Sequence, residues 1–245
     1  LAAEISVGDK YRRRSLRKAL AVAASLALLV LALLIDVAVG PGNFPLADVL
    51  ATIFDRESAP SRLAVVVWDV RLPVAMMAVL VGCMLGAAGA EMQTILNNPL
   101  ADPFTLGISS AASFGAALAI VTGIGVLPVA GPFLVTGNAF IFALLTSIIL
   151  FVFTRMRGVS VETFVLVGIA LLFTFNALLA FLQYSASETQ LQAIVFWMMG
   201  SLSRANWTKI GICAGILAIA LPRFASRNRM LTALTLGDDR AASLG

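Results

Sequence analysis

The chain has 245 residues, of which 60% are hydrophobic and 12% are charged, and its mean hydropathy is +0.98. These values exclude a soluble domain and predict a polytopic membrane protein with at most about seven spans of about 20 residues. The net charge of +4 does not indicate a nucleic-acid partner. Because histidine is absent, Ser-His-Asp triads and His-ligated zinc or haem are excluded, which argues against an enzyme. Cys83 and Cys213 lie in apolar runs without metal-ligand spacing, so we expect no metal site.

The first predicted span is an apolar run over residues 19–35, followed by Asp36 and the helix breaker Gly40-Pro41-Gly42. A cluster of basic residues precedes it, made up of Lys10, Arg12, Arg13, Arg14, Arg17 and Lys18. The alternative is a cleaved signal peptide. The run is longer than the usual signal core, however, and no clear small-x-small cleavage site follows it.

The second predicted span covers about residues 74–93 and begins after Pro73, a residue that the first turn of a helix tolerates. The connector before it, residues 41–67, is too polar to cross a bilayer, but we expect a short amphipathic helix within it. Gly82, Gly86 and Ala90 recur every four residues in the span. Small residues at this spacing predict a face on which a neighbouring helix packs closely.

Four further spans are predicted at about residues 105–122, 133–153, 162–182 and 207–221. The apolar run at 191–202 is too short to cross and is interpreted as a partial or re-entrant helix, which needs protein or water around its ends. The fold expected is therefore an all-α transmembrane helical bundle, a single domain over residues 1–245 with about six spans and a partial helix.

The positive charges predict the orientation. With a cytoplasmic N-terminus and six crossings, twelve of the seventeen Lys and Arg residues fall inside and five outside, as the positive-inside rule requires. Residues 94–104, 155–161 and 222–245 then face the cytoplasm.

Two polar residues within the spans have two interpretations each. Glu91 is either a carboxylate that extends to the membrane interface or a proton or ion site. Asn176, near the middle of the fifth span, either hydrogen-bonds to a neighbouring helix or faces an aqueous path.

Three groups of residues, in order along the chain, resemble the FecCD-type permeases of bacterial ABC importers for ferric siderophores, haem and cobalamin. The first is Trp68, Arg71-Leu72-Pro73, Gly82, Gly86, Gly89-Ala90, Gln93, Asn98-Pro99-Leu100-Ala101-Asp102-Pro103 and Leu106-Gly107. The second is Phe196-Trp197-Met198-Met199-Gly200-Ser201-Leu202 with Trp207, and the third is Leu236-Gly237-Asp238-Asp239-Arg240-Ala241-Ala242-Ser243-Leu244-Gly245. Val74, Ala88 and Asn97 depart from residues that are frequent in the family.

The resemblance implies a type II ABC importer permease in the bacterial inner membrane, with several further spans after Gly245. It implies that residues 231–245 form a cytoplasmic coupling helix, with Leu236, Gly237, Asp238, Asp239, Arg240 and Ala241 contacting the ATPase. It also implies a cytoplasmic gate at Ser160, Val161 and Glu162, and docking of a binding protein at Arg56 and Arg62. Gly168 and Asn176 are the candidates for the transport pathway. The 98–103 turn is either a further ATPase contact or a rigid connector.

The partners implied by the resemblance are a second permease subunit, identical or different, two ATPase subunits, a substrate-binding protein and membrane lipid. The sequence has no GxxxxGK[ST] loop, so we expect the chain itself to bind no cofactor, with ATP and Mg²⁺ bound by the ATPase. A ferric siderophore is the first expectation for the cargo, and haem and cobalamin stay open. The alternative class is an ion-coupled secondary transporter, which would be expected to place carboxylates or broken helices near mid-membrane.

Overall fold

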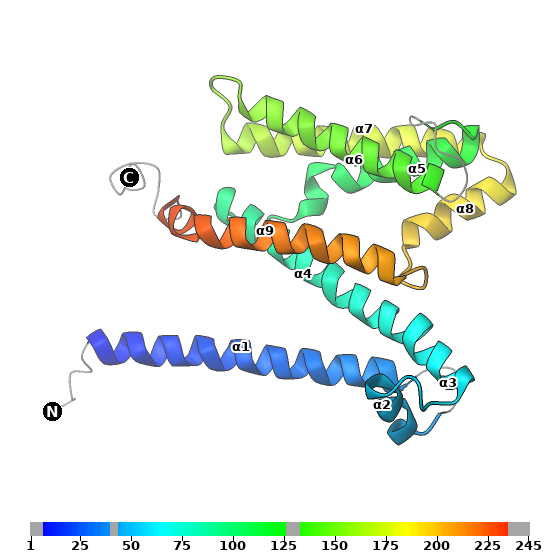
Figure 1. Cartoon of the computed structure of the whole chain (residues 1–245). Coiled ribbons are helices and arrows are strands. Elements are labelled where there is room, and N and C mark those ends of the chain that lie inside the picture. Colours follow the sequence, from blue (N-terminus) through cyan, green and yellow to red (C-terminus); the bar gives the residue numbers. More distant parts are fainter. Residues whose placement is uncertain (1–6, 40–43, 126–132, 235–245) are drawn as a thin grey trace. The chain divides into compact units, whose positions relative to one another are not determined.

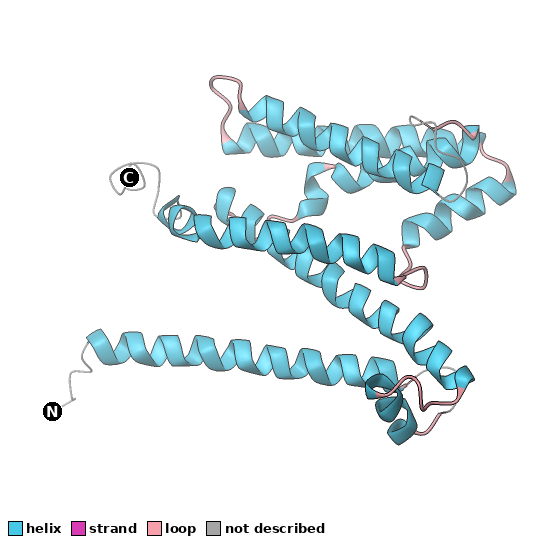
Figure 2. Cartoon of the chain, viewed as in Figure 1, coloured by secondary structure: helices cyan, strands magenta, loops and turns pink. Residues whose placement is uncertain are grey.

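The protein is described here from a computed structural model that covers residues 7–39, 44–125 and 133–234, with side chains between residues 12 and 227. Every regular element in these residues is helical (Figures 1 and 2). The α-helices are α1 (Val7–Ala38), α2 (Leu46–Phe54), α3 (Ser61–Val65), α4 (Leu72–Ile95), α5 (Ile108–Thr122), α6 (Phe133–Thr154), α7 (Val161–Ser185), α8 (Glu188–Met199) and α9 (Trp207–Leu234). A π-helical turn, η1 (Val66–Arg71), and a 3₁₀ helix, η2 (Pro103–Leu106), complete the set. The predicted all-α fold is confirmed.

Five helical segments within the described residues are long and apolar enough to cross a membrane. They are Arg12–Ala38, Ser61–Ile95, Phe133–Thr154, Val161–Ser185 and Trp207–Arg227. They correspond to the first, second, fourth, fifth and sixth predicted spans. The predicted third span differs, because its α-helix α5 has only 15 residues, about 22 Å of helix against about 30 Å of hydrocarbon. The partial helix predicted at 191–202 is α8, which has 12 residues.

The chain forms two compact units. The first comprises residues 1–81 and 202–214, and the second comprises residues 82–201 and 215–245. In the first unit, α2 is the short helix expected in the 41–67 connector, and it buries Val49 and Thr52. A buried apolar cluster joins the end of α1 to the segment from α2 to α4 and consists of Val37, Val49, Leu63, Val67, Leu72 and Ala75.

The second predicted span does not begin at Pro73, because the helix is continuous from Ser61 to Ile95. The π-helical turn η1 lies immediately before this proline, and Leu72 N–H donates to the Val67 carbonyl five residues back. Proline lacks an N–H and its ring collides with the carbonyl four residues earlier in a regular helix. The wider π turn accommodates the proline, which is fully buried, without ending the helix.

In the second unit, α5 packs against α6, α7 and α8. Gly115 permits the α5–α6 contact, since a Cβ there would stand 2.7 Å from the Asn138 carbonyl oxygen. Phe114 of α5 makes an edge-to-face contact with Phe142 of α6, with ring centroids 5.2 Å apart. A second buried cluster, consisting of Ala117, Leu179, Leu182 and Ile194, joins α5, α7 and α8. This cluster holds the short helix α8 against the long helix α7.

Candidate functional site

Arg71 fixes the end of α1 to the beginning of α4. Its side chain is only 7% exposed, and Nη1 donates to the carbonyl oxygens of Val37 at 2.9 Å and Ala38 at 3.0 Å. These carbonyls belong to the last turn of α1, where helical carbonyl groups lack intrahelical partners and the helix dipole favours a cation. The guanidinium also lies 6.0 Å from the centre of the Phe44 ring. The arginine of the Arg71-Leu72-Pro73 motif therefore supplies hydrogen-bond donors to the last carbonyl groups of α1.

Trp68 and Trp207, which lie 139 positions apart in the sequence, are in contact. Trp207 Nε1 donates to the Trp68 carbonyl at 3.0 Å, and the two ring centroids are 5.9 Å apart. Trp68 Nε1 in turn donates to the Thr52 carbonyl at 2.9 Å. The two tryptophans therefore join α2, η1 and the first turn of α9 in the first unit.

The two arginines predicted to dock a binding protein differ in their surroundings. Arg56 forms an ion pair with Asp69, with 3.3 Å between Nη2 and Oδ2, and its Cζ lies 5.7 Å from the centre of the Trp68 ring. Both side chains of the pair are about half-exposed. Arg62, in the first turn of α3, is exposed. A docking partner could reach both arginines, but at Arg56 it would compete with Asp69.

The turn after α4 is held by its own polar side chains. Asn97 ends the helix with a left-handed φ of 44°, a conformation that asparagine tolerates. The Asn98 side chain accepts from Leu100 N–H, and the Asp102 side chain accepts from Phe104 N–H at the start of η2. These contacts within the 98–103 turn are those of a rigid connector. A contact between this turn and an ATPase subunit stays a prediction.

The end of this connector packs against the middle of α7. A Cβ at Gly107 would stand 2.6 Å from Leu172 N, and one at Gly168 would stand 2.7 Å from Leu106 Cδ2. Gly168 and Leu172 lie about 10 and 16 Å along α7 from its first residue. Leu106 is only 6% exposed. Phe104 and Thr105 of η2 are exposed, so the contact with α7 is made by the last residue of η2 and by Gly107.

The predicted pathway and gate residues lie at different places along α7. Gly168 is buried against Leu106, whereas Asn176 is exposed. Ser160 caps the helix by accepting from Thr163 N–H at 3.3 Å, and Val161 and Glu162 form the exposed first turn. The gate assignment remains a prediction. The contacts of Ser160 are those of an ordinary helix cap.

The small-residue face of α4 has no neighbour within its own unit. Gly82, Gly86 and Ala90 are exposed, and no atom of the unit lies within 4 Å of a Cβ built at either glycine. Glu91, four residues before the end of α4, is half-buried. The close packing predicted for this face therefore requires something other than α5 to α8.

The predicted ATPase contacts lie outside the described residues: Leu236, Gly237, Asp238, Asp239, Arg240 and Ala241. The helix before them is longer than expected, because α9 continues to Leu234 instead of ending near residue 221. Pro222 lies inside it. The first residues assigned to the coupling segment, 231–234, thus continue α9.

Sequence reasoning missed Gln190, which joins α8 to α5. Its Oε1 accepts from Ser187 N–H at 3.0 Å, and its Nε2 donates to the Val121 carbonyl at 3.1 Å. The Ser-x-x-Gln spacing at 187–190 is a capping-box pattern that the sequence analysis could have used. Nothing in the sequence indicates the contact with α5.

Across the described residues, no three His, Cys, Asp or Glu side chains are grouped as a metal site would require. The same residues define a multi-pass, all-helical membrane protein. The sequence matches the FecCD transport family over residues 28–245. Since this match covers most of the chain, the protein belongs to the FecCD transport family.

Two relatives agree with this family. An ABC transporter permease of Methanocaldococcus jannaschii is 38% identical over 187 residues, which cover 74% of this chain and 54% of that protein. The vitamin B12 import system permease protein BtuC of Yersinia pseudotuberculosis is 33% identical over 179 residues, which cover 73% of this chain and 52% of that protein. The chain therefore spans about half the length of the curated relatives it matches.

A solved structure agrees as well. A metal-chelate type ABC transporter in an inward-facing conformation superposes with a TM-score of 0.70 and 28% identity, covering 90% of this chain and 64% of that chain.

Proposed function

We propose that this protein is a membrane-spanning permease subunit of an ABC importer that moves a metal chelate into the cytoplasm. The observation on which the proposal depends is the FecCD family match over residues 28–245, together with five helices able to span the bilayer. Relatives named as ABC transporter and vitamin B12 permeases support the same role. The chain provides alternating access, in which a nucleotide-dependent partner favours one of two helix packings.

The partners follow from this role. A second permease subunit completes the pathway, two ATPase subunits bind and hydrolyse ATP with Mg²⁺, and a binding protein delivers the chelate on the outer side. The N-terminus lies in the cytoplasm, because the basic residues in the first turns of α1 favour that side. The docking site for the binding protein includes the exposed Arg62 and the half-exposed Arg56.

Three metal chelates are candidate cargoes, and the test compares the two that have separate support. A ferric siderophore is the cargo expected first from the sequence resemblance. The same resemblance leaves haem open. Cobalamin is supported separately by the BtuC relatives at 33% identity. Uptake of labelled ferric siderophore and labelled cobalamin, each offered with its own binding protein, discriminates between them. Transport of only one identifies the cargo.

An ion-coupled secondary transporter is the competing function. Such proteins place ionisable residues near mid-membrane. Here Asp36, Glu91 and Glu162 lie within about one turn of a span end, and Asp69 is paired with Arg56. These positions favour the ATP-driven function.

The ATPase contact is tested by reversing the charge of the predicted coupling segment with Asp238→Lys and Asp239→Lys. In the complex with its ATPase, we expect ATP hydrolysis to lose its dependence on cargo-loaded binding protein and uptake to fall to background. The matched control, Asp238→Glu with Asp239→Glu, keeps the charge and should retain uptake. Normal uptake by the lysine variant would rule out the coupling assignment.

A further inference from the structure

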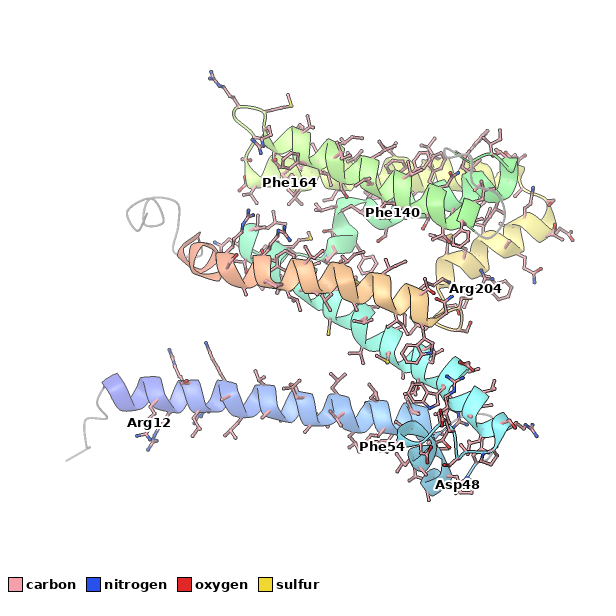
Figure 3. All side chains as sticks on the ribbon, in the orientation of Figure 1. Arg12, Asp48, Phe54, Phe140, Phe164 and Arg204 are labelled. Carbon is pink, nitrogen blue, oxygen red and sulfur yellow. The ribbon has the colours of Figure 1, made fainter. Side chains whose placement is uncertain are left out.

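The first turns of α1 place a dense group of cations next to the membrane. Residues 10–35 contain six Lys or Arg and no acidic residue. Five of these bases have described side chains, all of them exposed, and we call them the basic cluster: Arg12, Arg13, Arg14, Arg17 and Lys18. Figure 3 shows the Arg12 side chain extending away from the axis of α1. The cluster therefore belongs to the surface of the protein.

The length of the basic cluster along the helix axis is close to the thickness of one headgroup layer. The helix is unbroken through the cluster and into the apolar run that begins at residue 19. At 1.5 Å per residue, Arg12 and Lys18 are about 9 Å apart along the axis. The headgroup layer of one leaflet is about 5–8 Å thick, and long basic side chains can extend further toward an interface. All five charges can therefore reach the headgroup phosphates of the same leaflet.

Four of the five residues of the basic cluster lie on one side of α1, and Arg12 lies about 100° outside their arc. At about 100° per residue, Arg13, Arg14, Arg17 and Lys18 occupy about 140° of the helix circumference. Among the described residues, the one ion pair is Arg56–Asp69 in another part of the chain. The sequence places one acidic residue of α1, Asp9, beside the six basic residues, so the segment keeps an excess of positive charge. This excess attracts anionic groups, which at this depth are the phosphates of lipid headgroups.

We propose that the basic cluster binds the phosphate groups of anionic phospholipids of the phosphatidylglycerol class. Arginine presents several N–H donors in a planar fork that matches phosphate oxygens, and three of the four one-sided residues are arginine. Each basic residue near an anionic membrane surface strengthens the attraction of its segment to that surface by about fivefold. This contact fixes the depth of α1 in the bilayer, and it does not depend on the proposed transport function.

The test measures local lipid composition beside the cluster in vesicles. Ser15, which is exposed within the cluster, is replaced by cysteine and labelled with a fluorophore, with Cys83 and Cys213 changed to serine. Quenching by nitroxide-labelled phosphatidylglycerol is compared with quenching by nitroxide-labelled phosphatidylcholine at the same mole fraction. Both leaflets have the same composition, so the orientation of the inserted protein does not affect the ratio.

The unmodified cluster should enrich phosphatidylglycerol severalfold over phosphatidylcholine, because only the former carries a net negative charge for the basic residues to attract. Arg13→Gln, Arg14→Gln, Arg17→Gln and Lys18→Gln together should lower the ratio to near one. The matched control removes four exposed charges elsewhere, with Arg155→Gln, Arg157→Gln, Arg223→Gln and Arg227→Gln, and should keep the ratio within twofold. An equal fall in both variants would overturn the proposal, since it would reflect net charge alone.

A salt titration of the labelled protein with its cluster intact tests the same proposal without those glutamine substitutions. Raising the salt from 0.1 M to 1 M shortens the Debye length from about 10 Å to about 3 Å. We expect the phosphatidylglycerol enrichment to fall severalfold over this range. A ratio of one at low salt, or an enrichment that salt does not change, would contradict lipid binding by the basic cluster.

Discussion

Gly107→Ala should destabilise the protein more than Gly123→Ala, although the two glycines have nearly the same backbone conformation. Their φ values are 75° and 69°, both in the left-handed region that side chains disfavour. Their surroundings differ. A Cβ at Gly107 would stand 2.6 Å from Leu172 N and 3.1 Å from Leu171 C, whereas a Cβ at Gly123 would meet no atom within 4 Å.

The expected magnitudes follow from these two contributions. The left-handed conformation costs a residue with a side chain about 1–2 kcal/mol, which applies to both variants. Forcing a methyl group against the backbone of α7 adds about 1–3 kcal/mol at Gly107, because backbone atoms cannot rotate away. We therefore expect a loss of about 2–5 kcal/mol for Gly107→Ala and about 1–2 kcal/mol for Gly123→Ala.

The assay is thermal unfolding of the purified protein in detergent, with each variant compared under the same heating rate. A loss of 1 kcal/mol lowers Tm by about 2–4 °C for a chain of this size. Gly168→Ala and Gly82→Ala extend the comparison to helical glycines, of which only Gly168 contacts Leu106. Equal losses for Gly107→Ala and Gly123→Ala would refute the packing of the connector against α7.

Three further substitutions test other contacts. Arg71→Met should lower the free energy of unfolding by about 2–3 kcal/mol, because a charge-assisted contact to the α1 carbonyls is lost, and an unchanged Tm would contradict that role. Gln190→Ala should cost about 1–2 kcal/mol and speed hydrogen exchange in α8; unaltered exchange would mean that the apolar cluster alone holds α8. Gly86→Leu should leave the Tm of the single chain unchanged, since no atom of its unit is nearby, but should reduce cross-linked permease dimer, and full dimer recovery would exclude this face from the interface.

The long helices could be predicted from the sequence because an apolar run of about 20 residues has few alternatives in a membrane. Residues 133–153 and 162–182 were predicted as spans, and the helices are Phe133–Thr154 and Val161–Ser185. The ends of these helices were also predictable, since Ser160 is a typical N-cap residue and Arg155 interrupts the apolar run.

The breaks in helical geometry could not be predicted from the hydrophobicity pattern. Pro73 normally signals a helix start, yet here the π-helical turn η1 allows the helix to continue through it. Residues 103–106 form a 3₁₀ helix that Asp102 caps, and Gly107 and Gly168 allow a close approach between its end and α7. A hydrophobicity pattern contains no information on either of these two breaks.

The sequence identified the motif residues of the candidate site, but it did not identify the residues that they contact. Trp68 and Trp207 were singled out as motif residues, and the structure brings them together. Gly168, a candidate pathway residue, packs against Leu106, and its place in the pathway stays a prediction. Arg56 was assigned to a docking partner, although it already has a carboxylate neighbour in Asp69. Single-sequence reasoning cannot tell an intramolecular partner from an external one.

The measurement that tests the transport function most directly is chelate uptake into vesicles. The protein, expressed from its genomic reading frame, is reconstituted with its ATPase and binding protein, and entry of labelled ferric siderophore or cobalamin is followed. We expect uptake that requires ATP, Mg²⁺ and the ATPase subunit, and that is unaffected when ion gradients are dissipated. Uptake that continues without the ATPase, or that follows a proton or sodium gradient, would contradict the assignment as an ABC importer permease.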